Sequence, residues 1–227
     1  MRMGGICWIF GKVSVEQLSM LHPEVLLVPI LMLADYFLTI AGALLYKRGY
    51  GKHVRYENYE LNPMWQRSVD AVRWFNPRHL LITAFVTGFL LLVGEHVDPS
   101  VEPFYDFYFG LIATLFMIIV GRHLGNILIF LHAIKHPGDL SGEARLSYRV
   151  ALKASNSQLW QVFLPLVVMA IYEKSAFALG CLCAPPALAV GHFRWRRKYQ
   201  KQLQKMASQS QTKEEPPRPP SVTTASS

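Results

Sequence analysis

Long apolar stretches separated by polar loops organise this chain. The first covers about residues 25–46, VLLVPILMLADYFLTIAGALLY, with one acid, Asp35, near its middle. About 20 apolar residues in a helix span the hydrocarbon layer of a membrane. Four later stretches of the same kind cover about residues 78–95, 107–134, 158–173 and 176–193. The pattern predicts an all-α fold, a polytopic membrane bundle of about five transmembrane helices within residues 25–195.

The two ends of the chain differ from this bundle. Residues 1–24 are predicted to form an N-terminal lead with a short helix over Val13–Leu21. Residues 196–227 form a tail that is first basic and then, from about Ala207, rich in Ser, Gln, Thr and Pro, a composition typical of disorder. Inside the last span, the Pro185-Pro186 pair predicts a kink or a break.

Charged residues distinguish the two sides of the membrane. The loops at 47–78 and 135–158 and the segment after residue 193 are rich in Lys and Arg, whereas loop 95–106 is acidic and holds no Lys or Arg. Cytoplasmic loops of membrane proteins carry an excess of Lys and Arg. The distribution therefore predicts that the N-terminus lies outside and the C-terminus in the cytoplasm.

Composition agrees with this architecture and limits the partners. The chain is 52% hydrophobic, with a net charge of +8 and a pI of about 9.5. Its basic residues lie beside the spans, so the expected partner is the lipid bilayer and not nucleic acid. The alternative partner is another membrane protein or a second copy of this chain. The cysteines and the single His132–His136 pair lack the repeated spacing of a metal site, so no metal or cofactor is expected.

The polar residues inside the spans are the candidate functional residues. A carboxylate at mid-membrane costs roughly 2.5–3.5 kcal/mol on insertion scales, so Asp35 needs a partner or must be neutral. Asp35 and Thr39 share one face of the first helix, and Arg122 lies at a similar depth in the third. We therefore predict an Asp35–Arg122 pair, with Thr39, His123 and Asn126 satisfying the remaining donors and acceptors.

Two further features accompany this cluster. Gly121 and Gly125 have the GxxxG spacing that allows another helix to approach closely, so they are predicted to serve helix packing. In the first loop, Glu60 and Asn62 precede Pro63 in a Y-E-L-N-P turn sequence. Glu60 either joins the polar cluster from the cytoplasmic side or is a solvated loop acid. The sequence leaves both interpretations open.

An Asp followed four residues later by Thr, and then E-x-N-P, resembles a family of small uncharacterised prokaryotic membrane proteins. The matching residues are Asp35, Thr39, Glu60, Asn62 and Pro63, within the first two spans. The resemblance implies a multi-pass protein of the prokaryotic inner (plasma) membrane and carries no known activity. Arg55, Asn58, Glu60 and Pro63 also resemble, with compressed spacing, the R…N…E…P signature of the membrane-associated eicosanoid and glutathione enzymes.

Three functions are consistent with the sequence. The first is a non-enzymatic subunit or accessory protein whose buried polar cluster fixes helix packing, which the absence of a complete catalytic motif favours. The second is a membrane-embedded enzyme acting on a lipid or other apolar substrate, with Asp35, Glu60, Arg122 and His123 forming its polar pocket. The third is a proton-coupled carrier in which Asp35 titrates, although the chain lacks the internal repeats common in transporters.

Overall fold

A computed structural model describes residues 23–57, 59–95, 98 and 100–214. The predicted lead helix over Val13–Leu21 and residues 215–227 of the tail lie outside the described residues.

Among the described residues, five helices are long and apolar enough to cross a membrane. They are α2 (Leu27–Arg48), α4 (Pro77–Glu95), α5 (Glu102–Lys135), α6 (Tyr148–Glu173) and α7 (Ala176–Glu214). The prediction of an all-α bundle with about five transmembrane helices is confirmed. Many of their large apolar side chains are exposed, Phe85 to 75% and Leu128 to 68%, as lipid-facing side chains must be.

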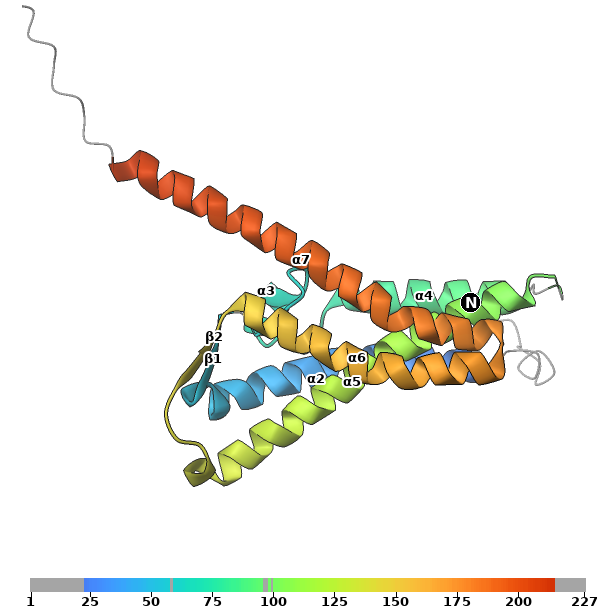
Figure 1. The fold of residues 1–227 in the computed structure, drawn as a ribbon, viewed down its shortest axis with the longest axis horizontal. Helices are drawn as coiled ribbons and strands as arrows, with labels where there is room; N and C mark the ends of the chain where they lie inside the picture. Colours follow the sequence, from blue (N-terminus) through green and yellow to red (C-terminus); the bar gives the residue numbers. More distant parts are fainter. Residues whose placement is uncertain (1–22, 58, 96–97, 99, 215–227) are drawn as a thin grey trace, which may run out of the picture.

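Six short elements of the described chain accompany the long helices; the first precedes α2, and the other five lie in loops at the opposite end of the bundle (Figure 1). They are the 3₁₀ helices η1 (Pro23–Leu26), η2 (Tyr50–Lys52) and η3 (Pro137–Asp139), the helix α3 (Gln66–Asp70), and the strands β1 (Val54–Tyr56) and β2 (Ala144–Leu146). The strands pair in parallel, with Val54 opposite Ala144. This pair ties the loop after α2 to the loop after α5 at the same end of the bundle (Figure 1).

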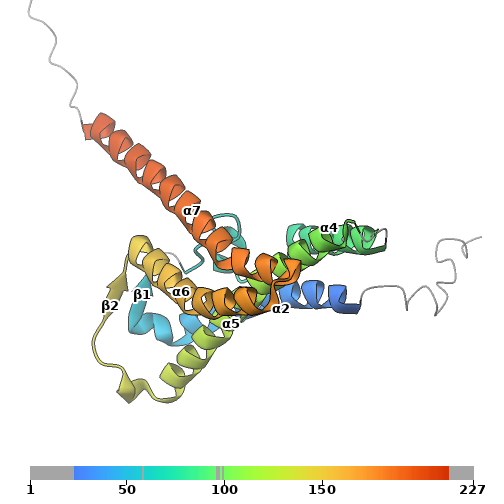
Figure 2. The same cartoon turned by 45° about the vertical axis from the view of Figure 1, so that its right-hand side comes forward.

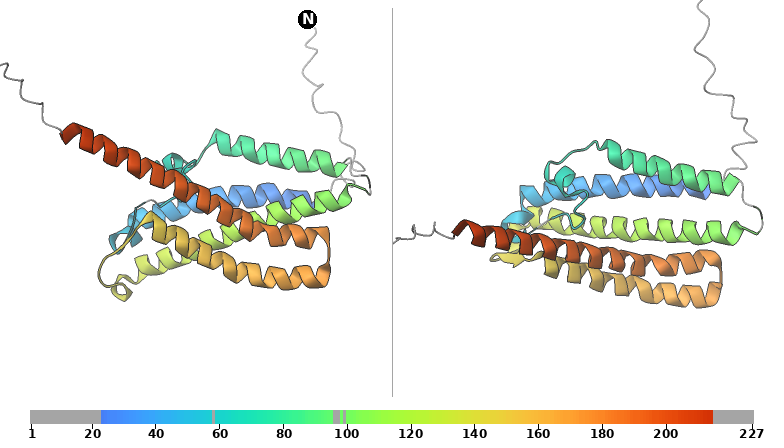
Figure 3. Two further views of the ribbon diagram at one scale, coloured as in Figure 1. Left: turned by 45° about the horizontal axis from the view of Figure 1, so that its top comes forward. Right: turned by 90° about the horizontal axis from the view of Figure 1, so that it is seen from above.

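The helices are arranged around α5. It packs against α2 on one side and α7 on the other, α4 lies against α2 and α5, and α6 lies against α7. The right-hand view of Figure 3 shows the resulting order across the bundle, α4, α2, α5, α7 and α6, and Figure 2 shows the end of α7 extending beyond the other helices. Helices α2 and α6 are therefore separated by α5 and α7.

The tightest helix contact is between α5 and α7. An added Cβ at Gly180 would overlap the backbone carbonyl oxygen of Phe107, and one at Gly110 would overlap that of Phe177. At Gly121 and Gly125 an added Cβ would meet nothing within 4 Å. The glycines predicted to pack helices therefore do not make a close contact within the described chain. The spacing of two glycines is visible in the sequence, but the side on which a neighbour packs is not.

The last helix is longer than predicted. It continues through Pro185-Pro186 without a break and ends at Glu214, within the segment predicted to be disordered from about Ala207 (Figure 1). Ala184 and Leu188, on either side of the prolines, are buried against α5 and α6, which holds the helix together there. Beyond the bundle, Arg, Lys and Gln are good helix formers and extend it.

Two other helices begin earlier in the chain than the apolar stretches that they contain. Helix α6 begins at Tyr148, ahead of the apolar stretch at 158–173, because Ser147 caps its first turn by accepting a hydrogen bond from the Val150 backbone N–H at 3.4 Å. Helix α5 begins at Glu102 and not at residue 107, with Pro103 in its first turn.

The α5–α7 contact predicts unequal effects of two matched glycine substitutions. Gly180→Ala should lower the free energy of unfolding by roughly 1–3 kcal/mol, because the methyl group has no room beside a backbone carbonyl. Gly121→Ala should leave it unchanged or raise it, because the site is open and Ala favours a helix. Reversible unfolding in mixed micelles measures both. Equal effects would show that α5 and α7 do not approach at Gly180.

Candidate functional site

A cavity of about 480 Å³ lies at the end of the bundle that carries β1 and β2. Side chains from α2 and α5 form one side, and those from α6 and α7 form another. The rest of the wall comes mainly from the segment after α2, namely Tyr56, Tyr59, Glu60, Leu61, Asn62, Trp65 and Val69. All members of the predicted polar cluster border it, namely Asp35, Thr39, Glu60, Asn62, Arg122, His123 and Asn126. The structure thus brings together residues that are separated by up to 91 positions in the sequence.

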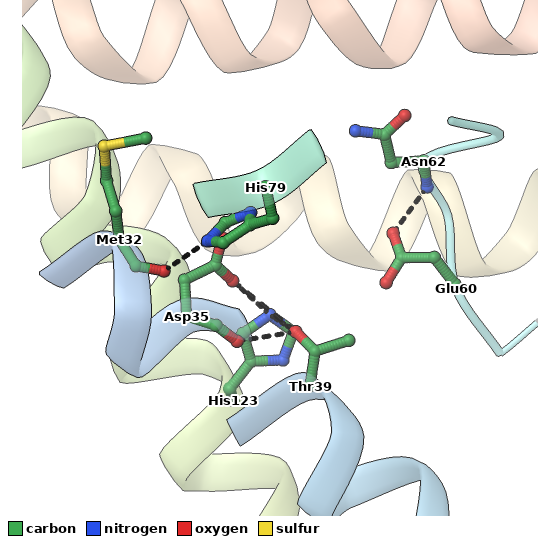
Figure 4. Close-up of polar contacts among 7 residues, drawn as sticks. All are labelled: Met32, Asp35, Thr39, Glu60, Asn62, His79 and His123. Carbon is green, nitrogen blue, oxygen red and sulfur yellow. Dashed lines mark hydrogen bonds and ion pairs between the residues drawn. The ribbon is translucent and has the colours of Figure 1, made fainter. Parts of the chain in front are cut away.

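Asp35 and Thr39 on α2 face His123 on α5 (Figure 4). The Thr39 hydroxyl donates to the backbone carbonyl of Asp35 at 2.8 Å, one turn earlier in the helix. Its oxygen then accepts from Nε2 of His123 at 3.0 Å, and the same nitrogen lies 3.1 Å from Oδ1 of Asp35. The contacts with two oxygens assign a proton to Nε2 of His123.

The prediction that Asp35 pairs with Arg122 is wrong in its partner. The described residues show an ion pair of Asp35 with His123 and none with Arg122. Neighbouring helix residues point about 100° apart, so a similar depth does not decide which of the two faces α2.

Glu60 belongs to the cavity wall and is not a solvated loop acid. Its Oε1 accepts the backbone N–H of Asn62 at 2.7 Å (Figure 4). Oδ1 of Asn62 accepts the backbone N–H of Met64 at 3.0 Å. These short-range bonds fold the Y-E-L-N-P segment back on itself and turn Glu60 inward. Desolvation by burial raises the pKa of the Glu60 carboxyl to about 7, against the opposing effects of the Asn62 amide and His123.

Arg122 is the cation of the cavity. Its Nε is buried and has no hydrogen-bond partner among the described residues. The guanidinium lies within electrostatic range of Glu60 and Asp35 without an ion pair to either. Asn126, one turn further along α5, borders the cavity beside it.

Two residues on the α6–α7 side were not predicted. Ser155 and His192 are buried and border the cavity. The His192 Nδ1 lies 2.5 Å from Oδ1 of Asn156, and the Ser155 hydroxyl lies 3.3 Å from Nε2 and 3.5 Å from Nδ1. A histidine near the end of a predicted span is a signal that could have identified this group.

This trio does not form an activated nucleophile. The Ser155 oxygen is almost equally distant from both ring nitrogens of His192, so it does not lie along the lone pair of Nε2. A serine activated by a histidine needs that alignment. We interpret the trio as a polar link between α6 and α7.

The loop residues over the cavity are held by α6 and α7. Glu57 accepts the backbone N–H of Tyr148 at 2.9 Å and also the hydroxyl of Tyr199. The Tyr148 hydroxyl donates to the backbone carbonyl of Leu61 at 2.6 Å. Because these contacts flank Glu60 in the sequence, they fix the position of its carboxyl group. On the opposite side, the Tyr59 hydroxyl lies against Gly42 of α2, where a larger residue would not fit.

The chemistry available in this cavity is that of proton transfer and charge stabilisation. Glu60 can hold or release a proton near neutral pH, and Arg122 can stabilise a negative charge. Within the described residues, no group of three or more His, Cys, Asp or Glu side chains could hold a metal ion.

The raised pKa of Glu60 predicts a carboxyl group that titrates near neutral pH. The carboxylic-acid carbonyl band in the infrared spectrum should lose one group around pH 7, and Glu60→Gln should remove this step. The protonated form stabilises the fold below about pH 4.5, and this contribution should be lost as the pH rises to about 7.

Glu143→Gln is the matched control for this titration, because Glu143 lies outside the cavity, in the loop between α5 and α6, beside Arg55 and Arg145. These partners lower the pKa of Glu143, so its replacement should leave the step near pH 7 unchanged. A titration step that survives in Glu60→Gln would contradict the assignment.

The contact between α2 and α5 predicts the outcome of two double-mutant cycles. Asp35→Asn combined with His123→Gln should give a coupling energy of roughly 0.5–3 kcal/mol in the free energy of unfolding, because residues in direct contact couple by this amount. Asp35→Asn combined with Arg122→Gln should give a smaller one. The reverse order would restore Arg122 as the partner of Asp35.

Comparisons with known proteins do not supply a function for this cavity. The chain matches no protein-family model, no curated protein and no solved structure. The resemblance carried by Asp35, Thr39, Glu60, Asn62 and Pro63 stays a prediction. The cavity itself therefore carries the evidence for a function.

Proposed function

We propose that this membrane protein binds a small amphipathic molecule in the cavity and transfers a proton to or from it. One observation carries the proposal: the charged and polar residues of the first and third predicted spans and of the first loop gather on the wall of one cavity of about 480 Å³. Sites for small molecules have volumes of roughly 300–1,000 Å³ and combine an apolar lining with a few convergent polar groups.

The lining of the cavity supports an amphipathic ligand. Leu115, Phe116 and Ile119 of α5 and Leu188 of α7 form an apolar part. The groups of Glu60, Asp35 and Arg122 form the polar part further toward the loop end. A lipid or another apolar molecule with one polar group would place its two parts against matching walls.

Glu60 supports an acid–base role for the site. A general acid or base works best when its pKa is near the operating pH, and burial brings the pKa of Glu60 to about 7. Arg122 would stabilise negative charge that develops on the bound molecule. The proposed reaction class is therefore proton transfer on a lipid-like substrate.

The proposal includes a position in the membrane. The excess of Lys and Arg in the loops supports a cytoplasmic position for the C-terminus and for the end of the bundle with β1 and β2, with the N-terminus outside. The cavity would then lie near the cytoplasmic face of a prokaryotic inner membrane, where molecules from the inner leaflet can reach it.

A second candidate function is that of a non-enzymatic subunit. The network of Asp35, Thr39 and His123 joins α2 to α5 and would stabilise the bundle without any chemistry. The open surface at Gly121 and Gly125 would then receive a helix of another membrane protein or of a second copy.

Filling the cavity should separate the two candidates. Ala151→Trp places a large ring in the cavity wall on α6 and should release any small amphiphile that purifies with the wild-type protein. Ser157→Trp is the matched control, because Ser157 is on the same helix, exposed and away from the cavity. Native mass spectrometry of protein in lipid nanodiscs measures the bound mass. Equal occupancy in both variants would exclude the cavity as the binding site.

A further inference from the structure

Arg122 is a half-buried cation whose Nε is fully buried and lacks a direct partner. Its Nε has no hydrogen bond, and no ion pair to its guanidinium is present among the described residues. Buried polar groups in native proteins are nearly always paired, so an orphaned donor that borders a cavity needs an explanation. An acceptor supplied by a bound molecule is the simplest one.

The two neighbouring acids do not fill this role, because neither forms an ion pair with Arg122 and each contacts another residue. The Asp35 carboxylate contacts His123 at 3.1 Å. The Glu60 carboxylate accepts the Asn62 amide at 2.7 Å. The planar guanidinium of Arg122 therefore keeps donors for a third acceptor, and guanidinium groups favour the oxygens of carboxylates and phosphates.

An apolar surface continues from Arg122 along the same helix. Leu115 and Ile119 lie seven and three residues before Arg122, which places all three on one face of α5. All three border the cavity, together with Phe116. A molecule whose head group contacts Arg122 can therefore extend an alkyl chain along α5 toward the middle of the bundle.

We propose, building on the function above, that the molecule bound in the cavity is an amphiphile with an anionic oxygen head group held by Arg122. Its apolar chain lies against Leu115, Phe116 and Ile119. The head group is a carboxylate or a phosphate, and both present the same acceptor oxygens to the guanidinium.

The charge state of Glu60 controls this binding. The titratable and charged groups around Glu60 and Arg122 come from all five long helices and the loop: Asp35 on α2, His79 on α4, His123 on α5, Tyr148 on α6, His192 on α7, and Tyr59 in the loop. When Glu60 is protonated, Arg122 faces one negative charge fewer. Ionisation of Glu60 adds a charge that repels an anionic ligand, so affinity should fall as the pH rises through about 7.

A head-group series tests the proposal on the wild-type protein in lipid nanodiscs. Decanoate, decyl phosphate, decanol and decylamine share one chain length, and native mass spectrometry or calorimetry gives their affinities. At least one of the two anions should bind about tenfold or more tightly than the alcohol and the amine. The stronger anion identifies a carboxylate or a phosphate head group. Equal or tighter binding of decanol or decylamine would overturn the proposal.

Variants then assign the preference to Arg122. Arg122→Gln should abolish the preference for anions, and Arg122→Lys, which keeps the charge, should retain part of it. If Arg122→Gln does not fold, the head-group series and the lysine variant still decide. Preference for anions that is unchanged in Arg122→Gln would overturn the assignment.

The pH dependence is measured with decanesulfonate, whose own charge is constant. Its affinity should fall between pH 6 and pH 8 in the wild type and stay level in Glu60→Gln. A rise with pH, or the same fall in both proteins, would contradict the role of Glu60.

The proposed function and this inference can fail separately. If Ala151→Trp releases the bound molecule but decanol binds more tightly than both anions, the cavity is a binding site and the proposed anionic head group is wrong. If Ala151→Trp displaces no probe, the cavity function itself fails.

Discussion

A charged group inside an apolar bundle must find its partners within the protein, and this constraint shapes the whole structure. Asp35 lies within α2, where the surrounding lipid offers no hydrogen bonds. Its carboxylate is satisfied by His123, and Thr39 connects the two. Helix α2 must therefore pack against α5 at this depth, and the close contact of α5 with α7 then places the second pair of helices.

The loops complete what the helices leave open. The parallel pairing of β1 with β2 joins the loops that follow α2 and α5. Glu57 attaches the same segment to Tyr148 and Tyr199 on the far side. Between these attachments, the turn formed by Asn62 directs Glu60 into the cavity. A short loop segment thus provides an acid at a fixed position, which an unattached loop could not do.

The charges on the cavity wall favour the anionic ligand that we propose. Asp35 and His123 form one pair, which leaves Arg122 and Glu60 as the remaining charged groups on the wall. Burial keeps Glu60 partly protonated at neutral pH, so the positive charge of Arg122 is not fully cancelled. The positive charge of Arg122 beside an apolar surface favours an anionic guest and disfavours a second cation.

The sequence by itself determined the helices, because apolar length and the requirement for internal hydrogen bonding in lipid leave few alternatives. It also identified Asp35, Thr39, Glu60 and Arg122, because polar residues in or near spans stand out against an apolar background. Tertiary structure alone decided that Asp35 faces His123, that Gly110 and Gly180 make the close contact, and that Ser155 and His192 join the cavity. These outcomes depend on the rotation of each helix about its axis, where a change of one residue turns a side chain by about 100°. Composition and spacing do not encode that rotation, and only the packing of all five helices sets it.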